Sequence, residues 1–158
     1  MSDRVEELMR RAITLGAKHM RAGAGGPFGA VIARDGQVIA EGVNRVTSTN
    51  DPTAHAEIAA IRAACQALGH FSLEECEIYS SCEPCPMCLG AIYWARLGAL
   101  YFANTRADAA AIGFDDDHIY REIPKPLRER EIPTLRMLLP EAKELFEEWR
   151  AMPDKVMY

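Results

Sequence analysis

Four residues in two short stretches have the side chains of a metal site. His55 and Glu57 lie close together, and Cys85 and Cys88 follow thirty residues after His55. One imidazole and two thiolates are ligands that Zn²⁺ prefers, and a zinc ion with three protein ligands keeps a fourth position for water. Zinc lowers the pKa of that water to near neutral, so the water becomes a hydroxide nucleophile. The spacing therefore predicts a catalytic zinc site with His55, Cys85 and Cys88 as ligands.

Each ligand stretch is expected at the start of a helix. Cys85 and Cys88 are three residues apart, which places both sulfurs on one helix face. Pro84 and Pro86 are typical of a loop that enters a helix, because proline is tolerated in the first turn. The positive end of the helix dipole also favours thiolate over thiol. We therefore expect two helix starts, one at His55 and one at Cys85, to converge on one metal ion.

Glu57 is the candidate proton carrier. In a regular helix, residues two apart point about 200° away from each other. Glu57 and His55 can therefore face the same ion only if His55 occupies the irregular first turn. A carboxylate in that position can move protons between a zinc-bound water and a substrate.

Cys82 leaves two other interpretations open. A closed structural zinc site needs four protein ligands, and Cys82 would be an obvious fourth. Cys82, Cys85 and Cys88 at equal spacing are also compatible with an iron–sulfur ligand run. Neither interpretation gives Glu57 a role, so the catalytic zinc site is preferred.

Composition indicates one globular domain from a reducing compartment. The chain has 158 residues, 49% of them apolar and 26% charged, which is enough for one sizeable core. Its formal net charge of −5 argues against a nucleic-acid partner. Of the five cysteines, Cys65 and Cys76 lie outside the metal motif and are expected in the core as thiols. With no apolar leader or membrane-spanning run, the sequence predicts a cytoplasmic protein.

The hydrophobic pattern predicts an α/β fold of three layers, α-β-α, around a mixed five-stranded sheet. The expected strands cover residues 28–34, 37–43, 77–81, 99–103 and 132–138, with Asp35-Gly36 as a hairpin turn. The expected helices begin at Asp3 and at His55, cover residues 85–95 and 107–112, and end with one lined by Ala142, Leu145, Phe146 and Trp149. The helix that starts at Cys85 is apolar nearly all round, so we expect it to be buried, with Trp94 in the core.

Three other segments are expected to be loops. The glycine-rich run 22–27 lacks the Lys-Ser/Thr of a phosphate loop and is expected to be a flexible connector. Residues 45–51 are polar and lead into the metal helix. Residues 113–118 carry three adjacent carboxylates, a charge run that by itself favours a solvent-exposed loop.

Several segments together resemble the cytidine-deaminase superfamily. The pattern His-x-Glu … Pro-Cys-x-x-Cys is the signature of zinc deaminases that act on nucleobases. Residues 27–32, 50–57 and 81–96, together with Asn44, resemble this superfamily over nearly the whole chain. Gly113-Phe114-Asp115-Asp116, Ile119-Tyr120 and a chain ending in Tyr158 are similar to its small bacterial guanine deaminases.

The resemblance implies a cytidine-deaminase-like fold and the hydrolysis of guanine to xanthine and ammonia, a step of purine catabolism. Zinc hydroxide would attack the ring carbon that bears the amino group. Glu57 would carry the proton of the water to a ring nitrogen. Asp116 would act as a second acid for the leaving amino group, with Asp115 as the reserve candidate.

The resemblance also implies a substrate-binding set and a homodimer. Asn44 would bind the edge of the base, since its amide both donates and accepts hydrogen bonds. Phe28 and Phe114 would sandwich the purine, and Ala56 would complete the site within the chain. The domain would span residues 1–158, with the tail 153–158 exchanged between subunits so that Tyr158 contacts the substrate of its neighbour.

Three competing functions stay open at this point. A tRNA adenosine deaminase shares the zinc motifs, but it needs a basic surface for RNA. A deaminase of another small aminated heterocycle, such as cytosine or a triazine, would use the same metal chemistry. A zinc-stabilised interaction protein without turnover is the third, and it would have no use for Glu57.

Overall fold

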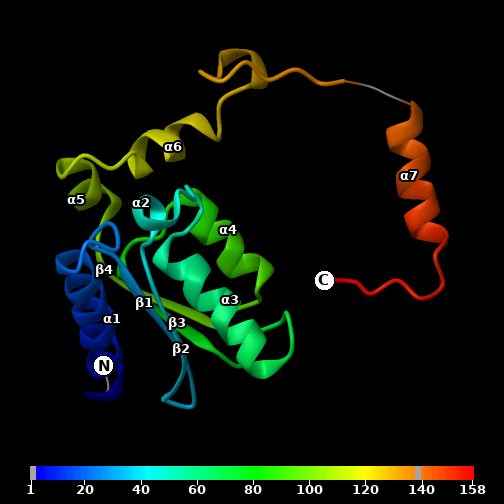
Figure 1. Ribbon diagram of the computed structural model, residues 1–158. Coiled ribbons are helices and arrows are strands. Elements are labelled where there is room, and N and C mark those ends of the chain that lie inside the picture. The colour runs from blue at the N-terminus through cyan, green and yellow to red at the C-terminus, as the bar shows by residue number, and fades with distance from the viewer. Residues whose placement is uncertain (1–2, 138–139) are drawn as a thin grey trace. The chain divides into compact units, whose positions relative to one another are not determined.

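The computed structural model describes residues 3–137 and 140–158 (Figure 1). The contacts of the chain divide it into two units, Met1–Tyr120 and Arg121–Tyr158. The single domain expected over residues 1–158 stays a prediction.

A mixed sheet of four strands, in the order β2-β1-β3-β4, forms the centre of the first unit. Its strands are β1 (Gly29–Arg34), β2 (Gln37–Val43), β3 (Glu77–Cys82) and β4 (Ala99–Asn104). Strand β1 pairs antiparallel with β2 and with β3, and β3 pairs parallel with β4. The expected hairpin turn is confirmed, because Asp35 and Gly36 both have a positive φ, of 50° and 73°.

Helices cover both faces of this sheet. The helical segments are α1 (Asp3–Arg21), α2 (Val46–Thr49), α3 (Ala56–Leu68), α4 (Pro86–Trp94), α5 (Arg106–Ala111), α6 (Asp116–Glu122), the 3-10 helix η1 (Leu127–Glu129) and α7 (Pro140–Ala151). Figure 1 shows α1 on one side of the strands and the pair α3 and α4 on the other. The three-layer α-β-α architecture predicted from the sequence is thereby confirmed.

Alternate residues of each central strand supply two separate cores. Ala30 and Ile32 of β1 pack with the alanines of α3, whereas Val31 and Ala33 pack with Leu8 of α1. This alternation follows from the two-residue period of a strand. Each central strand is therefore held from both faces.

A close backbone approach fixes the start of α3 against the sheet. A Cβ added at Gly42 of β2 would lie 2.1 Å from the carbonyl oxygen of Ala56 and 2.5 Å from the amide nitrogen of Ala60. Only glycine leaves room for this contact. The first turn of α3, which follows His55, is therefore seated directly on β2.

Two expectations about strands and loops are wrong. The fifth strand expected over residues 132–138 is absent from residues 132–137, and Leu138 lies outside the described residues. Pro133 has no N–H to donate to a neighbouring strand. Ile132 and Leu135 are exposed, so their side chains do not pack against the sheet. The loop expected over residues 113–118 instead begins helix α6 at Asp116, where acidic side chains suit the helix dipole.

The expectation that α4 is buried is also wrong. Met87, Tyr93 and Trp94 are exposed, with Trp94 at 62%, while Cys88 and Ile92 face the core. An apolar composition all round a helix predicts a partner on every side, but the described residues of the first unit cover only the side of α4 that carries Cys88 and Ile92. The polar segment 45–51, expected to be a loop, contains the short helix α2.

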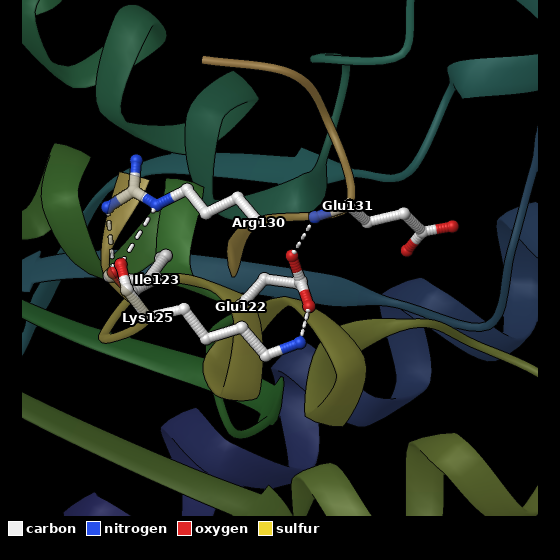
Figure 2. Close-up of polar contacts among 5 residues, drawn as sticks. All are labelled: Glu122, Ile123, Lys125, Arg130 and Glu131. Carbon is white, nitrogen blue, oxygen red and sulfur yellow. Dashed lines mark hydrogen bonds and ion pairs between the residues drawn. The ribbon is translucent and has the colours of Figure 1, made fainter. Parts of the chain in front are cut away.

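In the second unit, a short stretch folds onto itself before α7 (Figure 2). The carboxylate of Glu122 accepts a hydrogen bond of 2.9 Å from the backbone N–H of Glu131 and also contacts the ammonium of Lys125. The guanidinium of Arg130 donates to the carbonyl oxygens of Ile123, at 2.9 Å, and Lys125, at 3.3 Å. These contacts fix the turn around η1.

Among the helices of residues 3–137 and 140–158, none combines the length and the apolar character that crossing a membrane requires.

Candidate active site

His55, Cys85 and Cys88 are brought together as the sequence predicts. The Nδ1 atom of His55 lies 3.6 Å from the Sγ of Cys85 and 3.5 Å from the Sγ of Cys88. Zinc bonds of 2.0–2.3 Å in tetrahedral geometry require nitrogen–sulfur separations of about 3.6 Å. The donor set and its spacing therefore fit a zinc ion held by one nitrogen and two sulfurs.

Both ligand stretches begin helices, as expected. His55 is the residue before α3 and Cys85 the residue before α4, and both have extended backbones, with ψ of 157° and 166°. Neither side chain caps its own helix. Because His55 has an extended backbone and precedes the helix, the 100° rotation per helical residue does not turn its side chain away from that of Glu57.

The two sulfurs shift each other's pKa in opposite directions. The hydrogen bond with Cys88 lowers the pKa of Cys85, and the same contact raises the pKa of Cys88. Metal binding to cysteines displaces their thiol protons. The pair is therefore arranged to bind a cation as thiolates.

Cys82 is not part of this cluster. Its thiol faces the carbonyl oxygen of Thr105 at 3.7 Å, and burial raises the pKa of Cys82 to about 11. Among the described residues, the group of donors at this place contains His55, Cys85 and Cys88 alone. A closed structural site with Cys82 as fourth ligand is therefore not supported by the geometry.

Glu57 is buried beside the ligands. Glu57 is only 6% exposed, and its Oε1 accepts a hydrogen bond of 3.2 Å from the hydroxyl of Ser80 on β3. Burial raises the pKa of Glu57. A carboxyl group with a raised pKa exchanges protons more readily near neutral pH than an exposed one.

A cavity of about 350 Å³ opens beside the ligands and holds most of the predicted site residues. This volume is in the range of small-molecule sites. The wall is formed by Gly26, Phe28, Asn44, Val46, Thr47, Pro52, His55, Ala56, Glu57, Cys82, Glu83, Cys85, Phe114 and Asp116. Tyr158 belongs to the second unit, and its role stays a prediction.

The two phenylalanines contact each other. The ring centroids of Phe28 and Phe114 are 4.7 Å apart, with the ring planes at 78°. This edge-to-face contact leaves no room for a base between them, so a purine sandwiched by both rings does not match the structure.

Asn44 is committed to the backbone at one end of its amide. Its Oδ1 accepts hydrogen bonds from the N–H groups of Gly26, at 3.1 Å, and Val46, at 3.3 Å. The glycine-rich run was expected to be a flexible connector, but Gly26 lies in the cavity wall and is bonded to a site residue. That expectation is therefore wrong for Gly26.

The structure separates the neighbouring aspartates. Asp116 is half-buried in the cavity wall, whereas Asp115 is exposed. Burial raises the pKa of Asp116, and the nearby Cys85 adds to the effect. Asp116 is therefore the member of the run that faces the ligands.

Sequence reasoning missed two residues that support the site. Ser80 holds Glu57, and Tyr120 donates to the backbone carbonyl of Pro84 at 2.7 Å, next to the ligand Cys85. The only available signal for Ser80 was its place in a pair of adjacent polar residues, Ser80 and Ser81, in a strand that is almost entirely buried. Tyr120 was noted for its resemblance, without a role.

Comparison with known proteins gives a consistent picture. Residues 2–104 match the family model for the cytidine and deoxycytidylate deaminase zinc-binding region. The chain is 55% identical to the guanine deaminase of Bacillus subtilis (strain 168), over 97% of this chain and 98% of the relative.

The X-ray structure of guanine deaminase from Bacillus subtilis superposes with a TM-score of 0.94 at 54% identity and covers 100% of this chain and 99% of that one. A tRNA-specific adenosine deaminase of Agrobacterium fabrum (strain C58) is 53% identical over 86 residues, which are 54% of this chain and 57% of the relative. The similarity to the guanine deaminase therefore spans nearly the whole chain, whereas the similarity to the adenosine deaminase spans about half of each chain.

Cysteine substitutions test the ligand set. Cys82→Ala should keep one zinc ion per chain, because Cys82 lies outside the cluster, whereas the equally buried Cys88→Ala should lose it. Zinc content is measured by plasma mass spectrometry on purified protein, with circular dichroism as a control for folding. A folded Cys82→Ala protein without zinc would contradict the three-ligand site.

Proposed function

Because the chain belongs to the cytidine and deoxycytidylate deaminase zinc-binding family, we propose that it is a zinc-dependent guanine deaminase. The reaction is guanine plus water to xanthine plus ammonia, which places the protein in guanine catabolism. One observation carries the proposal: the ligands His55 and Cys85, the buried Glu57 and Asn44 all line one cavity of about 350 Å³. The relative at 55% identity over 97% of the chain supports guanine as the substrate.

Bound zinc would be held by His55, Cys85 and Cys88, and it would supply the Lewis acidity that makes water a nucleophile near neutral pH. Glu57 accepts a proton from the attacking water and delivers it to a ring nitrogen of the base. The hydroxyl of Ser80 holds the carboxylate in place for both steps. Burial in the cavity wall keeps other water away from the carboxyl group.

Asp116 supplies the proton that the leaving amino group needs. Its raised pKa means that it retains a proton at higher pH than an exposed aspartate does. It lies in the same cavity wall as Glu57 and Cys85. The two carboxyl groups therefore divide the work, with Glu57 at the water and Asp116 at the departing ammonia.

Asn44 selects for acceptors on the base. Since its Oδ1 is bonded to two backbone N–H groups, its remaining capacity is the N–H donors of the amide. Guanine presents O6 and N7, both acceptors, whereas adenine has an amino donor in place of O6. This arrangement favours guanine over adenine.

The phenylalanines and Ala56 complete the pocket. Because Phe28 and Phe114 contact each other, the purine would lie against them from the cavity side instead of between them. Ala56 is fully buried at the start of α3 and offers a small side chain near the base.

Two observations weigh against the tRNA adenosine deaminase alternative. The chain carries a net charge of −5, whereas RNA binding needs a basic surface. The adenosine deaminase relative covers 54% of this chain, and the guanine deaminase relative covers 97%.

Exposed apolar side chains support the proposal of a homodimer with exchanged C-terminal tails. Tyr93 and Trp94 of α4 are 71% and 62% exposed, and α7 exposes Leu145 and Phe146. Each unit therefore exposes apolar side chains of its own, and such exposure marks sites of protein association. A second copy would cover them, with Tyr158 of each tail reaching the site of the other subunit. The five cysteines form no disulfide among the described residues, which supports a cytoplasmic location.

Zinc-loaded protein should release ammonia from guanine faster than from adenine, cytosine or guanosine. Glu57→Gln should retain zinc and lose turnover by about 100- to 10,000-fold, as expected for a lost general base. A coupled ammonia assay and zinc analysis measure both properties. Glu41→Gln, on the outer side of β2, serves as the matched control. Inosine formation in a tRNA without ammonia from guanine would instead support the adenosine deaminase alternative.

The donor role of Asn44 can be separated from its structural role. Asn44→Asp keeps an acceptor for Gly26 and Val46 but has no N–H for the base, so KM for guanine should rise about tenfold, the value of one hydrogen bond. The preference for guanine over adenine should narrow in steady-state assays. Asn44→Ala removes both roles and should also lower the Tm. An unchanged KM in Asn44→Asp would contradict the donor role.

Deletion of residues 153–158 should lower kcat/KM by about 100-fold, because an incomplete site misplaces the substrate. Co-expression of the truncated chain with full-length Glu57→Gln should restore turnover, since a mixed dimer joins an intact Glu57 to an intact tail from the other subunit. Ammonia release and light scattering measure the result. A truncated protein with normal turnover, or no complementation in mixed dimers, would refute the tail exchange.

A further inference from the structure

Tyr120 joins helix α6 to the loop that carries a metal ligand. Its hydroxyl donates a 2.7 Å hydrogen bond to the carbonyl oxygen of Pro84. Pro84 directly precedes Cys85, and its own side chain is fully buried. The bond therefore ends at the backbone that sets the position of the Cys85 sulfur.

Arg106 holds the same tyrosine from a third segment. The centre of its guanidinium lies 4.6 Å from the centroid of the Tyr120 ring, a cation–π distance. The backbone N–H of Arg106 donates at 2.9 Å to the carboxylate of Glu83, the neighbour of Pro84. The ligand loop, the start of α5 and helix α6 thus form a closed set of contacts around one aromatic ring.

Tyr120 is also one helical turn from Asp116. Residues four apart on a helix lie on the same face, so the anchored residue and the cavity-lining carboxyl group share one side of α6. Asp116 and Cys85 both line the cavity. A contact that fixes Tyr120 against the ligand loop therefore fixes Asp116 relative to Cys85.

We propose that Tyr120 is a positioning residue that holds the Asp116 carboxyl group at a set place relative to the zinc ligands. The proposal rests on the proposed function, in which Asp116 protonates the leaving amino group. The hydroxyl is the essential part, because the cation–π contact with Arg106 needs only the ring. Tyr120 itself faces the backbone of Pro84 and does not act on the substrate.

The variant Tyr120→Phe removes the hydroxyl and keeps the ring. We expect kcat for guanine to fall about tenfold with KM unchanged within about twofold, the pattern of an interaction used only in the transition state. Tyr101→Phe is the matched control, because Tyr101 stacks on Tyr79 at 4.8 Å in the core on the α1 side of the sheet. The control should keep wild-type kcat and KM.

A double-mutant cycle with Asp116→Asn tests the route of the effect. If Tyr120 acts through Asp116, adding Tyr120→Phe to Asp116→Asn should cause no further loss of kcat, because coupled residues are not additive. Losses that multiply in the double variant would overturn the proposal.

A second readout does not depend on turnover. Zinc release to an excess of chelator should be several times faster in Tyr120→Phe than in wild type or Tyr101→Phe, because the loop before Cys85 loses its anchor. If Asp116→Asn has no measurable turnover, this release rate decides alone, and an unchanged rate overturns the proposal.

The two proposals fail in different ways. Wild-type protein without ammonia release from guanine would refute the proposed function. Active wild-type protein with an unchanged kcat in Tyr120→Phe would refute the role of Tyr120 only.

Discussion

The active site depends on the meeting of two helix starts. His55 and Cys85 are 30 positions apart in the chain, yet their ligand atoms must approach within 3.6 Å. The close contact of Gly42 with the first turn of α3 sets one of these starts on the sheet. The other is delivered by β3, the central strand that pairs with both β1 and β4. The sheet therefore acts as the rigid base on which the metal geometry is set.

Neighbouring residues of the same type differ in chemistry because their side chains have different surroundings. Cys82 and Cys85 are both buried, but the first faces a backbone carbonyl and the second faces a histidine and another thiol. The pKa of one thiol is therefore raised and that of the other lowered. Asp115 and Asp116 also differ in position, because Asp115 is exposed and Asp116 is half-buried in the cavity wall. The two members of each pair have the same residue type, so only their positions in the fold distinguish them.

The sequence predicted the site better than its surroundings. The ligands His55, Cys85 and Cys88 were predicted correctly because metal chemistry restricts residue type and spacing. The hairpin at Asp35-Gly36 was predicted correctly because few residues adopt a positive φ. The catalytic role of Glu57 stays a prediction. The fold of three layers followed from periodicity. The prediction of a fifth strand was wrong because composition alone does not show whether a backbone has a neighbouring strand to pair with. The apolar run that contains Pro133 has the composition of a strand but no such neighbour.

Other errors of the sequence-based predictions concern which side chains a residue contacts in the folded protein. The exposure of Trp94 was missed because an apolar helix has the same pattern whether its own chain or another chain covers it. The contact between Phe28 and Phe114, and the roles of Ser80 and Tyr120, depend on which side chains the fold places opposite each other. Local sequence carries no signal for such pairs.

The bonds from Gly26 and Val46 to the Asn44 oxygen have a consequence for how substrate choice can evolve. An oxygen must face these two amides, so the other end of the side chain, a nitrogen in asparagine and a second oxygen in aspartate, is the part that a base meets. One substitution can therefore exchange a donor for an acceptor while the connector before β1 keeps its bond. Diversification of base preference at this position is open to point mutation, but only to residues that retain the inner oxygen.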